Sequence, residues 1–270
     1  MKEETKRTPR ITSVLNISGG VGKTITAEMI GRGYAGEEKK TLLVDADGQG
    51  DLSDAVMPEV NFEDSDCTLA DVMAGKKDIQ ECIVKTDVEN LYLIPNNLHM
   101  FEVVLLMQSM CGADFRLNEL LRKLDFDEIV IDNNSSANIM TFNAVFASDV
   151  IICPSSISLR TIIGITHTRQ LVVNSIKGAP KVFRNNRRID FRILLTKITR
   201  NKNNREGIQQ LRDLYGDAVF ETVIRFQQKP VQDAEFAGIS LLDDTESGIA
   251  EDYRNLIKEL LREEKDKYQE

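Results

Sequence analysis

The motif Ser18-Gly19-Gly20-Val21-Gly22-Lys23-Thr24 is the strongest indication of the fold in this sequence. An apolar, β-branched run, 11–17, precedes it, and residues 27–31 after it have the composition of a helix. A glycine loop between a strand and a helix is the context in which such a motif binds phosphate. The glycines let backbone N–H groups turn inward, and the helix N-terminus adds positive potential. The stretch therefore predicts a phosphate-binding loop in which Lys23 pairs with the β- and γ-phosphates and Thr24 binds Mg²⁺.

This loop is a variant of the plain phosphate-binding motif. The plain motif, Gly-x4-Gly-Lys-Thr, needs a first glycine where this chain has Asn16-Ile17. The alternative interpretation is a glycine turn that binds nothing, and the strand and helix on either side argue against it.

Length and composition favour one domain with a sizeable core. The chain has 270 residues, 41% of them apolar, and no linker or internal repeat divides it. We therefore expect a short tail over 1–10 and a single domain over 11–270. The sequence has no apolar run long enough for a membrane span, and its charged start does not resemble a signal peptide.

Cysteine and histidine usage argues against metal sites and disulfides. The four cysteines are widely spaced and form no Cys-x-x-Cys pair: Cys67, Cys82, Cys111 and Cys153. This spacing predicts reduced thiols in a cytosol. With only His99 and His167, a histidine-based triad or metal cluster is not expected.

Charge is unevenly distributed along the chain. The net charge is −9, yet residues 177–205 hold ten basic residues and one acid, so this basic segment carries +9 and the remainder −18. Such asymmetry indicates a face made for a polyanion. A solvated basic loop explains it equally well, and both interpretations stay open here.

Strands and helices alternate from the glycine loop to the C-terminus. Apolar runs predict strands at 40–44, 91–95, 128–132, 149–154, 192–196 and 219–224. Between them the spacing predicts helices, including a buried or interfacial one over 98–110 and a covering helix with its stripe over 249–261. Thr68 and Asp71 are spaced as a capping pair. The pattern predicts an α/β fold, a doubly wound, mostly parallel sheet with helices on both faces.

The order of motifs resembles the ParA/MinD/Soj family of deviant Walker A ATPases, which have a P-loop NTPase fold. The resemblance rests on 16–24, on Asp45-Ala46-Asp47-Gly48-Gln49-Gly50, and on the strand that ends in Asp132. Residues 92–97, and 223–225 followed by Asp233-Ala234, are weaker landmarks. The likeness runs from about Ile11 to Leu260 and is nearer to the partition branch than to MinD.

The resemblance implies ATP and Mg²⁺ as cofactors and a role for each matching residue. Lys23 would be the phosphate lysine, Thr24 a Mg²⁺ ligand, and Asp132 would hold the metal through water. Asp47 would orient the attacking water, with Asp45 supporting it. Nucleotide contacts are expected from Ser18, Gly19, Gly20, Val21, Gly22, Lys23, Thr24 and Thr196. Guanine recognition usually needs an Asp two residues after Thr196-Lys197, where Ile198-Thr199 stand, so ATP is favoured.

Two positions depart from the family pattern. The family's signature lysine, which crosses a sandwich dimer to the partner's nucleotide, is replaced by Ser18, which offers a hydrogen bond but no charge. Some carboxysome-positioning relatives also carry serine there and still hydrolyse ATP. We expect either another basic group across the dimer or low turnover. Gly48 stands where partition proteins usually have proline, which loosens the loop that carries Asp47.

The resemblance implies a cytoplasmic, nucleoid-associated ATPase, slow and partner-stimulated, that acts as a homodimer. It would bind DNA non-specifically and distribute a plasmid, chromosome region or other cargo with a centromere-binding, ParB-like partner. Phosphate contacts are expected from Arg184, Arg187, Arg188, Arg200, Lys202 and Arg225. No helix-turn-helix extension precedes Ile11, so operator recognition is not expected, and neither is membrane binding.

Three alternatives use the same fold. A MinD-like membrane cycle needs a basic amphipathic C-terminal helix, which the tail 263–270 does not supply. An iron–sulfur reductase needs paired cysteines soon after the strand that ends in Asp132, but the next cysteine is Cys153. A nucleotide-binding scaffold that has lost hydrolysis along with the signature lysine stays open.

Overall fold

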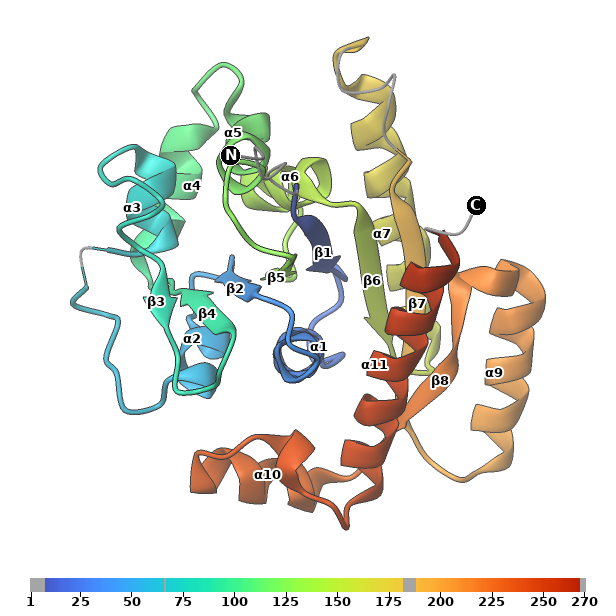
Figure 1. Ribbon diagram of the computed structural model, residues 1–270. Coiled ribbons are helices and arrows are strands. Elements are labelled where there is room, and N and C mark those ends of the chain that lie inside the picture. Colours follow the sequence, from blue (N-terminus) through green and yellow to red (C-terminus); the bar gives the residue numbers. More distant parts are fainter. Residues whose placement is uncertain (1–7, 66, 182–187, 268–270) are drawn as a thin grey trace.

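The computed structural model of the chain describes residues 8–65, 67–181 and 188–267. Eight strands in these residues form one sheet in the order β3-β4-β2-β5-β1-β6-β7-β8 (Figure 1). Their bounds are β1 Arg10–Val14, β2 Thr41–Asp45, β3 Val84–Lys85, β4 Leu91–Ile94, β5 Glu128–Asp132, β6 Val150–Ser155, β7 Asp190–Ile198 and β8 Val219–Arg225. Neighbouring strands are parallel except β3 and β4, which are antiparallel. The predicted doubly wound α/β fold is confirmed; β3 was missed because its two residues carry no periodic pattern.

Helices cover both faces of the sheet, with α1 and α11 in front of it in Figure 1 and α6 behind. One layer consists of α1 Lys23–Gly36, α2 Asp51–Val56, α10 Gln228–Ala237 and α11 Gly248–Lys267. The other consists of α3 Leu69–Ala74, α4 His99–Met107, α5 Arg116–Leu121, α6 Ile139–Ala147, α7 Leu159–Gly178 and α9 Lys202–Tyr215. Short 3-10 turns lie at Ala113–Phe115, Gly216–Ala218 and Leu241–Asp243.

The core lies between these layers and the sheet. Side chains alternate along each strand, so in β5 Ile129 and Ile131 pack with α3 to α6 while Val130 packs with α1 and α11. Because both faces are covered, the central strands are apolar on both sides, and every residue of β2 and β5 is buried.

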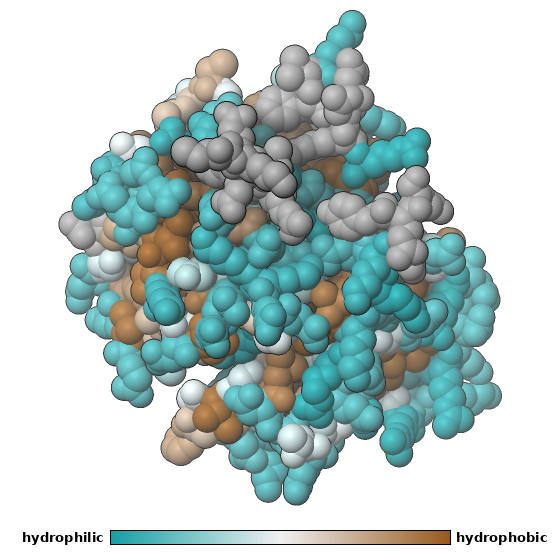
Figure 2. Space-filling view, viewed as in Figure 1, coloured by the Kyte–Doolittle hydropathy of each residue, from teal (hydrophilic) through white to brown (hydrophobic). Residues whose placement is uncertain are grey.

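The C-terminal helix α11 is the predicted covering helix. Its stripe is buried, including Tyr253, Leu256 and Leu260, and the Tyr253 and Thr26 hydroxyls lie 3.2 Å apart. The surface over α11 is mostly hydrophilic in Figure 2. Its apolar side therefore packs on the core. Among the described residues, no helix combines the length and apolar character needed to cross a membrane.

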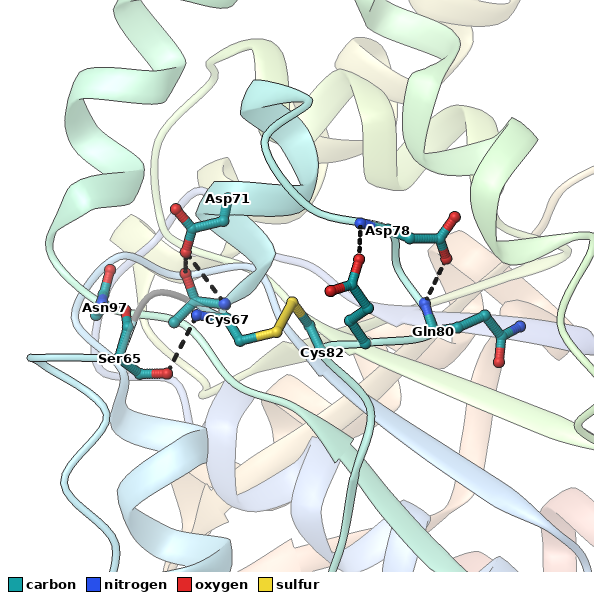
Figure 3. Close-up of a disulfide and its surroundings, with 9 residues drawn as sticks. Ser65, Cys67, Asp71, Asp78, Gln80, Cys82 and Asn97 are labelled. Carbon is teal, nitrogen blue, oxygen red and sulfur yellow. Dashed lines mark hydrogen bonds between the residues drawn. A yellow bond between two sulfur atoms is a disulfide. The ribbon is translucent and has the colours of Figure 1, made fainter.

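The prediction of reduced thiols is wrong for one pair, because Cys67 and Cys82 form a disulfide around α3 (Figure 3). The chain between them turns back, so their Cα atoms lie 4.9 Å apart despite a separation of 15 residues. Beside it, the predicted capping pair is confirmed, since Thr68 N and Oγ1 donate to Asp71 at 3.2 and 2.9 Å. Spacing along the chain cannot reveal such a fold-back.

Helix α4 is buried on only one face, so the first of the two predictions, full burial, is wrong, and an interface on its other face stays a prediction. Met100, Val103, Val104 and Met107 are buried in the core. The opposite side and its flanks expose Leu98, Phe101, Leu105, Leu106 and Met110. The excess of apolar residues over a one-sided stripe therefore lies on the surface.

Candidate nucleotide-binding site

The carboxyl ends of three neighbouring strands bring together the glycine loop, the segment that begins at Asp45, and Asp132. Strands β2, β5 and β1 are neighbours and parallel, so their carboxyl ends, with the segments that follow Asp45, Asp132 and Val14, lie together. The N–H of Ala46 donates to the Asp132 carbonyl at 2.9 Å, which ties two of these ends. Carboxyl ends of strands in open α/β sheets are where ligands bind.

Asn16 shapes the start of the glycine loop. Its Nδ2 donates to the Pro154 carbonyl at 2.7 Å, and its Oδ1 accepts from the Ser18 N–H at 2.8 Å. Further on, Gly20 and Gly22 adopt φ of 70° and 85°, which glycine tolerates best. A side-chain amide thus bridges Ile17, the position at which the plain motif has its first glycine.

Lys23 lies at the start of α1 and points into this site. Only 8% of the residue is exposed, and Nζ donates to Ser135 Oγ at 2.6 Å and to the Ser18 carbonyl at 3.4 Å. Burial lowers the pKa of Lys23, while the nearby Asp132 and Asp47 carboxylates oppose that shift. Sequence reasoning missed Ser135; its place three residues after Asp132, at the carboxyl end of β5, was the available signal.

Asp132 is a buried acid whose bonding is incomplete. Its Oδ1 has no hydrogen-bond partner among the described residues, although Thr24 hydrogen-bonds the carboxylate. Burial, together with the charge of Asp45, raises the pKa of Asp132 well above its usual value. An orphaned carboxylate oxygen beside a hydroxyl is a donor set that suits a hard cation such as Mg²⁺. Thr24 and Asp132 therefore fit the predicted metal role.

Asp45 and Asp47 differ in their surroundings. Asp45 is buried and accepts from Ser53 N at 2.9 Å and Ser53 Oγ at 2.7 Å, and burial raises its pKa to about 7. Asp47 is only half-buried, and its Oδ1 accepts from the Gln49 N–H at 3.1 Å. Asp45 therefore braces the loop, and Asp47 is the carboxylate free to face a ligand.

A cavity of about 420 Å³ opens beside Gly22 at the ends of β7 and β8. Thr196 lines it, but its hydroxyl donates to the Val21 carbonyl at 2.9 Å and so holds the glycine loop to β7. The neighbouring Lys197 has φ of 56°, an uncommon conformation for a non-glycine residue. The cavity also includes residues that sequence reasoning missed: Phe226, Gln227, Gln228 and Val231.

Within the described residues, the basic segment does not form one face. Strand β7 runs through it, with Arg188 before the strand and Arg200 after it, and its nine residues span about 30 Å at roughly 3.3 Å per residue. Between them, Arg192 is buried and paired with Glu263. Arg188, Arg200 and Lys202 are exposed, and Arg184 and Arg187 lie outside the described residues.

Arg225 lies at the end of β8 and lines the cavity. Its Nε and one terminal nitrogen each donate to the Asp252 carboxylate at 2.7 Å. These bonds raise the pKa of Arg225 further and hold the guanidinium in place. A phosphate at this position would compete with Asp252.

Comparison with known proteins agrees with this geometry. The family model AAA_31, described as an AAA domain, matches residues 9–186. The chain is 26% identical over 264 residues to the chromosome partitioning protein ParA of Caulobacter vibrioides, covering 96% of each chain. It is 26% identical to the sporulation initiation inhibitor protein Soj of Bacillus subtilis, covering 93% of this chain and 98% of Soj.

A solved structure supports the fold. The structure of a putative plasmid partition protein from Borrelia burgdorferi bound to AMPPNP superposes with a TM-score of 0.79 at 22% identity, covering 94% of this chain and 99% of that one. The family match extends over more than half of the sequence, and the fold and relatives agree with it. The chain therefore belongs to the AAA_31 family of AAA domains and is a P-loop ATPase of the ParA/MinD type.

Proposed function

We propose that this protein is a ParA-like ATPase that binds ATP with Mg²⁺, dimerises, and binds DNA without sequence preference. Hydrolysis, slow and stimulated by a ParB-like partner, would reset a cycle that positions a plasmid, chromosome region or other cargo on the nucleoid. The observation that carries the proposal is the convergence of Lys23, Thr24, Asp47 and Asp132 beside a cavity at Gly22. The partitioning names of the relatives support it.

The chemistry needs little beyond positioning and charge neutralisation. The glycine-loop N–H groups and the Lys23 ammonium would bind the phosphates, and Asp47 would orient the attacking water. Bound Mg²⁺ would neutralise charge on the phosphates, held by Thr24 and by Asp132 through water. The cavity at Thr196 would take the base.

Ser18 replaces the lysine that would act across a dimer. A Cβ added to Gly164 of α7 would lie 2.2 Å from Ser18 Oγ, so this serine packs closely on the α7 backbone. Ser18→Lys tests the consequence, because a productive lysine would raise the hydrolysis rate. An unchanged rate would mean that another basic group already supplies the charge.

DNA contacts are proposed first for the exposed side chains Arg200 and Lys202, which follow β7 on the cavity side of the sheet. Arg225 lies at the same edge, whereas Arg188 lies at the opposite one. Phosphate contacts of this kind carry no sequence information and weaken steeply with salt.

The deciding experiment measures binding to a random-sequence duplex with ATP, ADP or no nucleotide at two salt concentrations. Binding only with ATP, fading at the higher salt and lost in Arg200→Ala/Lys202→Ala, would support the proposal. Lys85→Ala is the matched control, since this exposed lysine lies in β3 at the opposite end of the sheet. If the protein binds no DNA with ATP, with ADP or without nucleotide, the DNA step is overturned. If it hydrolyses no ATP even with DNA and the partner present, a nucleotide-binding scaffold without hydrolysis is favoured instead.

A further inference from the structure

The loop that carries Asp47 is covered by an aromatic ring from α4. A Cβ built on Gly48 would lie 3.1 and 3.2 Å from two ring carbons of Phe101 and 3.3 Å from Met100 Cβ. The ring therefore rests on the bare backbone next to Asp47. Gly48 has no positive φ, so a larger residue there would press on Phe101 and Met100 rather than strain the backbone.

Phe101 is firmly placed although its ring is only partly buried. It has 47% of its surface exposed, while its neighbour Met100 is 1% exposed in the core. The start of α4 is fixed by Asn97, whose Oδ1 accepts from the His99 N–H at 3.2 Å and whose Nδ2 donates to the Phe62 carbonyl at 2.9 Å. The helix can thus act as a rigid support for the loop.

Backbone hydrogen bonds hold the loop at its two ends, and the first of them joins the Ala46 N–H to the Asp132 carbonyl at 2.9 Å. The N–H of Asp47 donates to Asp45 Oδ1 at 3.1 Å, and the N–H of Gly50 donates to the Asp47 carbonyl at 3.3 Å. The Asp47 carboxylate accepts from the Gln49 N–H within its own loop and is attracted by the Lys23 ammonium. A contact on Gly48 from outside the loop therefore restricts the backbone that aims this carboxylate.

We propose that Phe101 is a positioning residue for Asp47, acting through van der Waals contact with Gly48. This inference rests on the proposed function, in which Asp47 orients the attacking water. The ring holds the loop in the conformation that presents the carboxylate, and its loss lets the loop take up others. Since Phe101 contacts the loop at Gly48, its removal impairs the chemical step and leaves nucleotide binding unchanged.

The first test replaces the ring. Phe101→Ala should lower kcat about tenfold, because a small misplacement of a reacting group is costly, while the Kd for AMPPNP changes less than about twofold. Phe101→Leu, which keeps a branched apolar side chain, should restore most of kcat. Leu105→Ala is the control, because Leu105 is on the same helix and 68% exposed.

The second test uses the reciprocal residue. Gly48→Ala should lower kcat about threefold, because its Cβ must displace the ring. With the ring gone, the one close contact left to the added methyl is Met100 Cβ at 3.3 Å, so Gly48→Ala/Phe101→Ala should come close to Phe101→Ala alone. Such non-additivity is the mark of a direct contact, and an additive double variant would contradict it.

Amide hydrogen exchange of residues 46–50 in the nucleotide-free protein separates this inference from the proposed function. Phe101→Ala should speed exchange there about fivefold, whereas Leu105→Ala should not. If Phe101→Ala matches Leu105→Ala in both kcat and exchange, the positioning role is wrong. If the wild type hydrolyses no ATP, the proposed function fails, and the exchange result alone still upholds or overturns the contact with the loop.

Discussion

Strand β5 carries a buried acid at each end, and the two ends differ in how that acid is compensated. Glu128 and Asp132 are each 1% exposed. Lys39 Nζ donates to Glu128 Oε1 at 2.7 Å and also pairs with Glu264 of α11. Asp132 instead has a neutral hydroxyl, Thr24, as its hydrogen-bond partner and a second acid, Asp45, as its neighbour.

This difference in compensation distinguishes Glu128, whose charge has a structural partner, from Asp132, whose charge has a proposed role in metal binding. Burial raises the pKa of Glu128 to about 7, and the Lys39 ammonium limits that rise. At the other end, Asp45, Asp47 and Asp132 gather around Lys23, whose own hydrogen bonds go to Ser135 and Ser18. At the amino end the Lys39 ammonium offsets the Glu128 charge, although Glu128 Oε2 has no hydrogen-bond partner among the described residues. The carboxyl end holds surplus negative charge that a bound cation would offset.

The largest expected effect comes from Asp132→Asn. Removing the carboxylate should lower Mg²⁺-dependent ATP hydrolysis at least about 100-fold, since electrostatic groups at such centres contribute that much. The same change should raise the free energy of unfolding by about 1 kcal/mol, because an incompletely paired buried charge is removed. Steady-state hydrolysis and urea denaturation measure the two quantities. A loss of both activity and stability would mean that Asp132 is structural.

Lys39→Met makes the opposite test at the amino end. Glu128 is left buried without its counter-charge, so the free energy of unfolding should fall by about 2 kcal/mol at pH 8. The loss should be smaller at pH 6, where Glu128, with its raised pKa, is mostly protonated. Hydrolysis should stay within about twofold of wild type. A tenfold loss of kcat would show that the two ends are coupled.

The pH dependence sharpens the comparison further. The folded state binds the Glu128 proton more tightly than the unfolded state, so this residue's contribution to stability falls as pH rises from about 4.5 to about 7. The raised pKa of Asp132 acts in the same direction, but metal binding requires its ionised form. The rise in Tm produced by Mg²⁺ with AMPPNP should therefore be larger at pH 8 than at pH 6. Asp132→Asn should remove this difference, and Lys39→Met should preserve it.

The sequence predicts the carboxyl end far better than the amino end. Apolar runs predict the strands, and the glycine loop and the acids lie at the ends of those strands. These positions together predict where Lys23, Asp47 and Asp132 meet. Ser135 was missed because a serine in an ordinary polar turn carries no pattern. Thr196 was predicted from the sequence, but other walls of the cavity, such as Phe226 and Gln228, were missed because they come from about 200 residues beyond the loop.

Charge along the chain was the least reliable guide. The basic segment contains ten basic residues. In the fold, however, Arg192 of β7 pairs with Glu263, and the length of β7 separates Arg188 from Arg200. The pairing of Lys39 with Glu128 spans 89 residues, so no local pattern could show it. Side-chain direction and long-range partners depend on packing, which spacing alone does not specify.

The smallest expected effect concerns Glu264, the more exposed of the two acids that pair with Lys39 at the amino end of β5. Glu264 is 16% exposed in its side chain, pairs with Lys39, and lies 3.8 Å from Arg10. Glu264→Gln leaves Lys39 its bond to Glu128, so the free energy of unfolding should fall by less than about 1 kcal/mol, as for ion pairs near the surface. Added salt should shrink the difference further. A loss as large as that of Lys39→Met would mean that the Lys39–Glu264 pair, and not the Lys39–Glu128 pair, carries the stabilisation. The cluster around Lys39 would then be an anchor for α11.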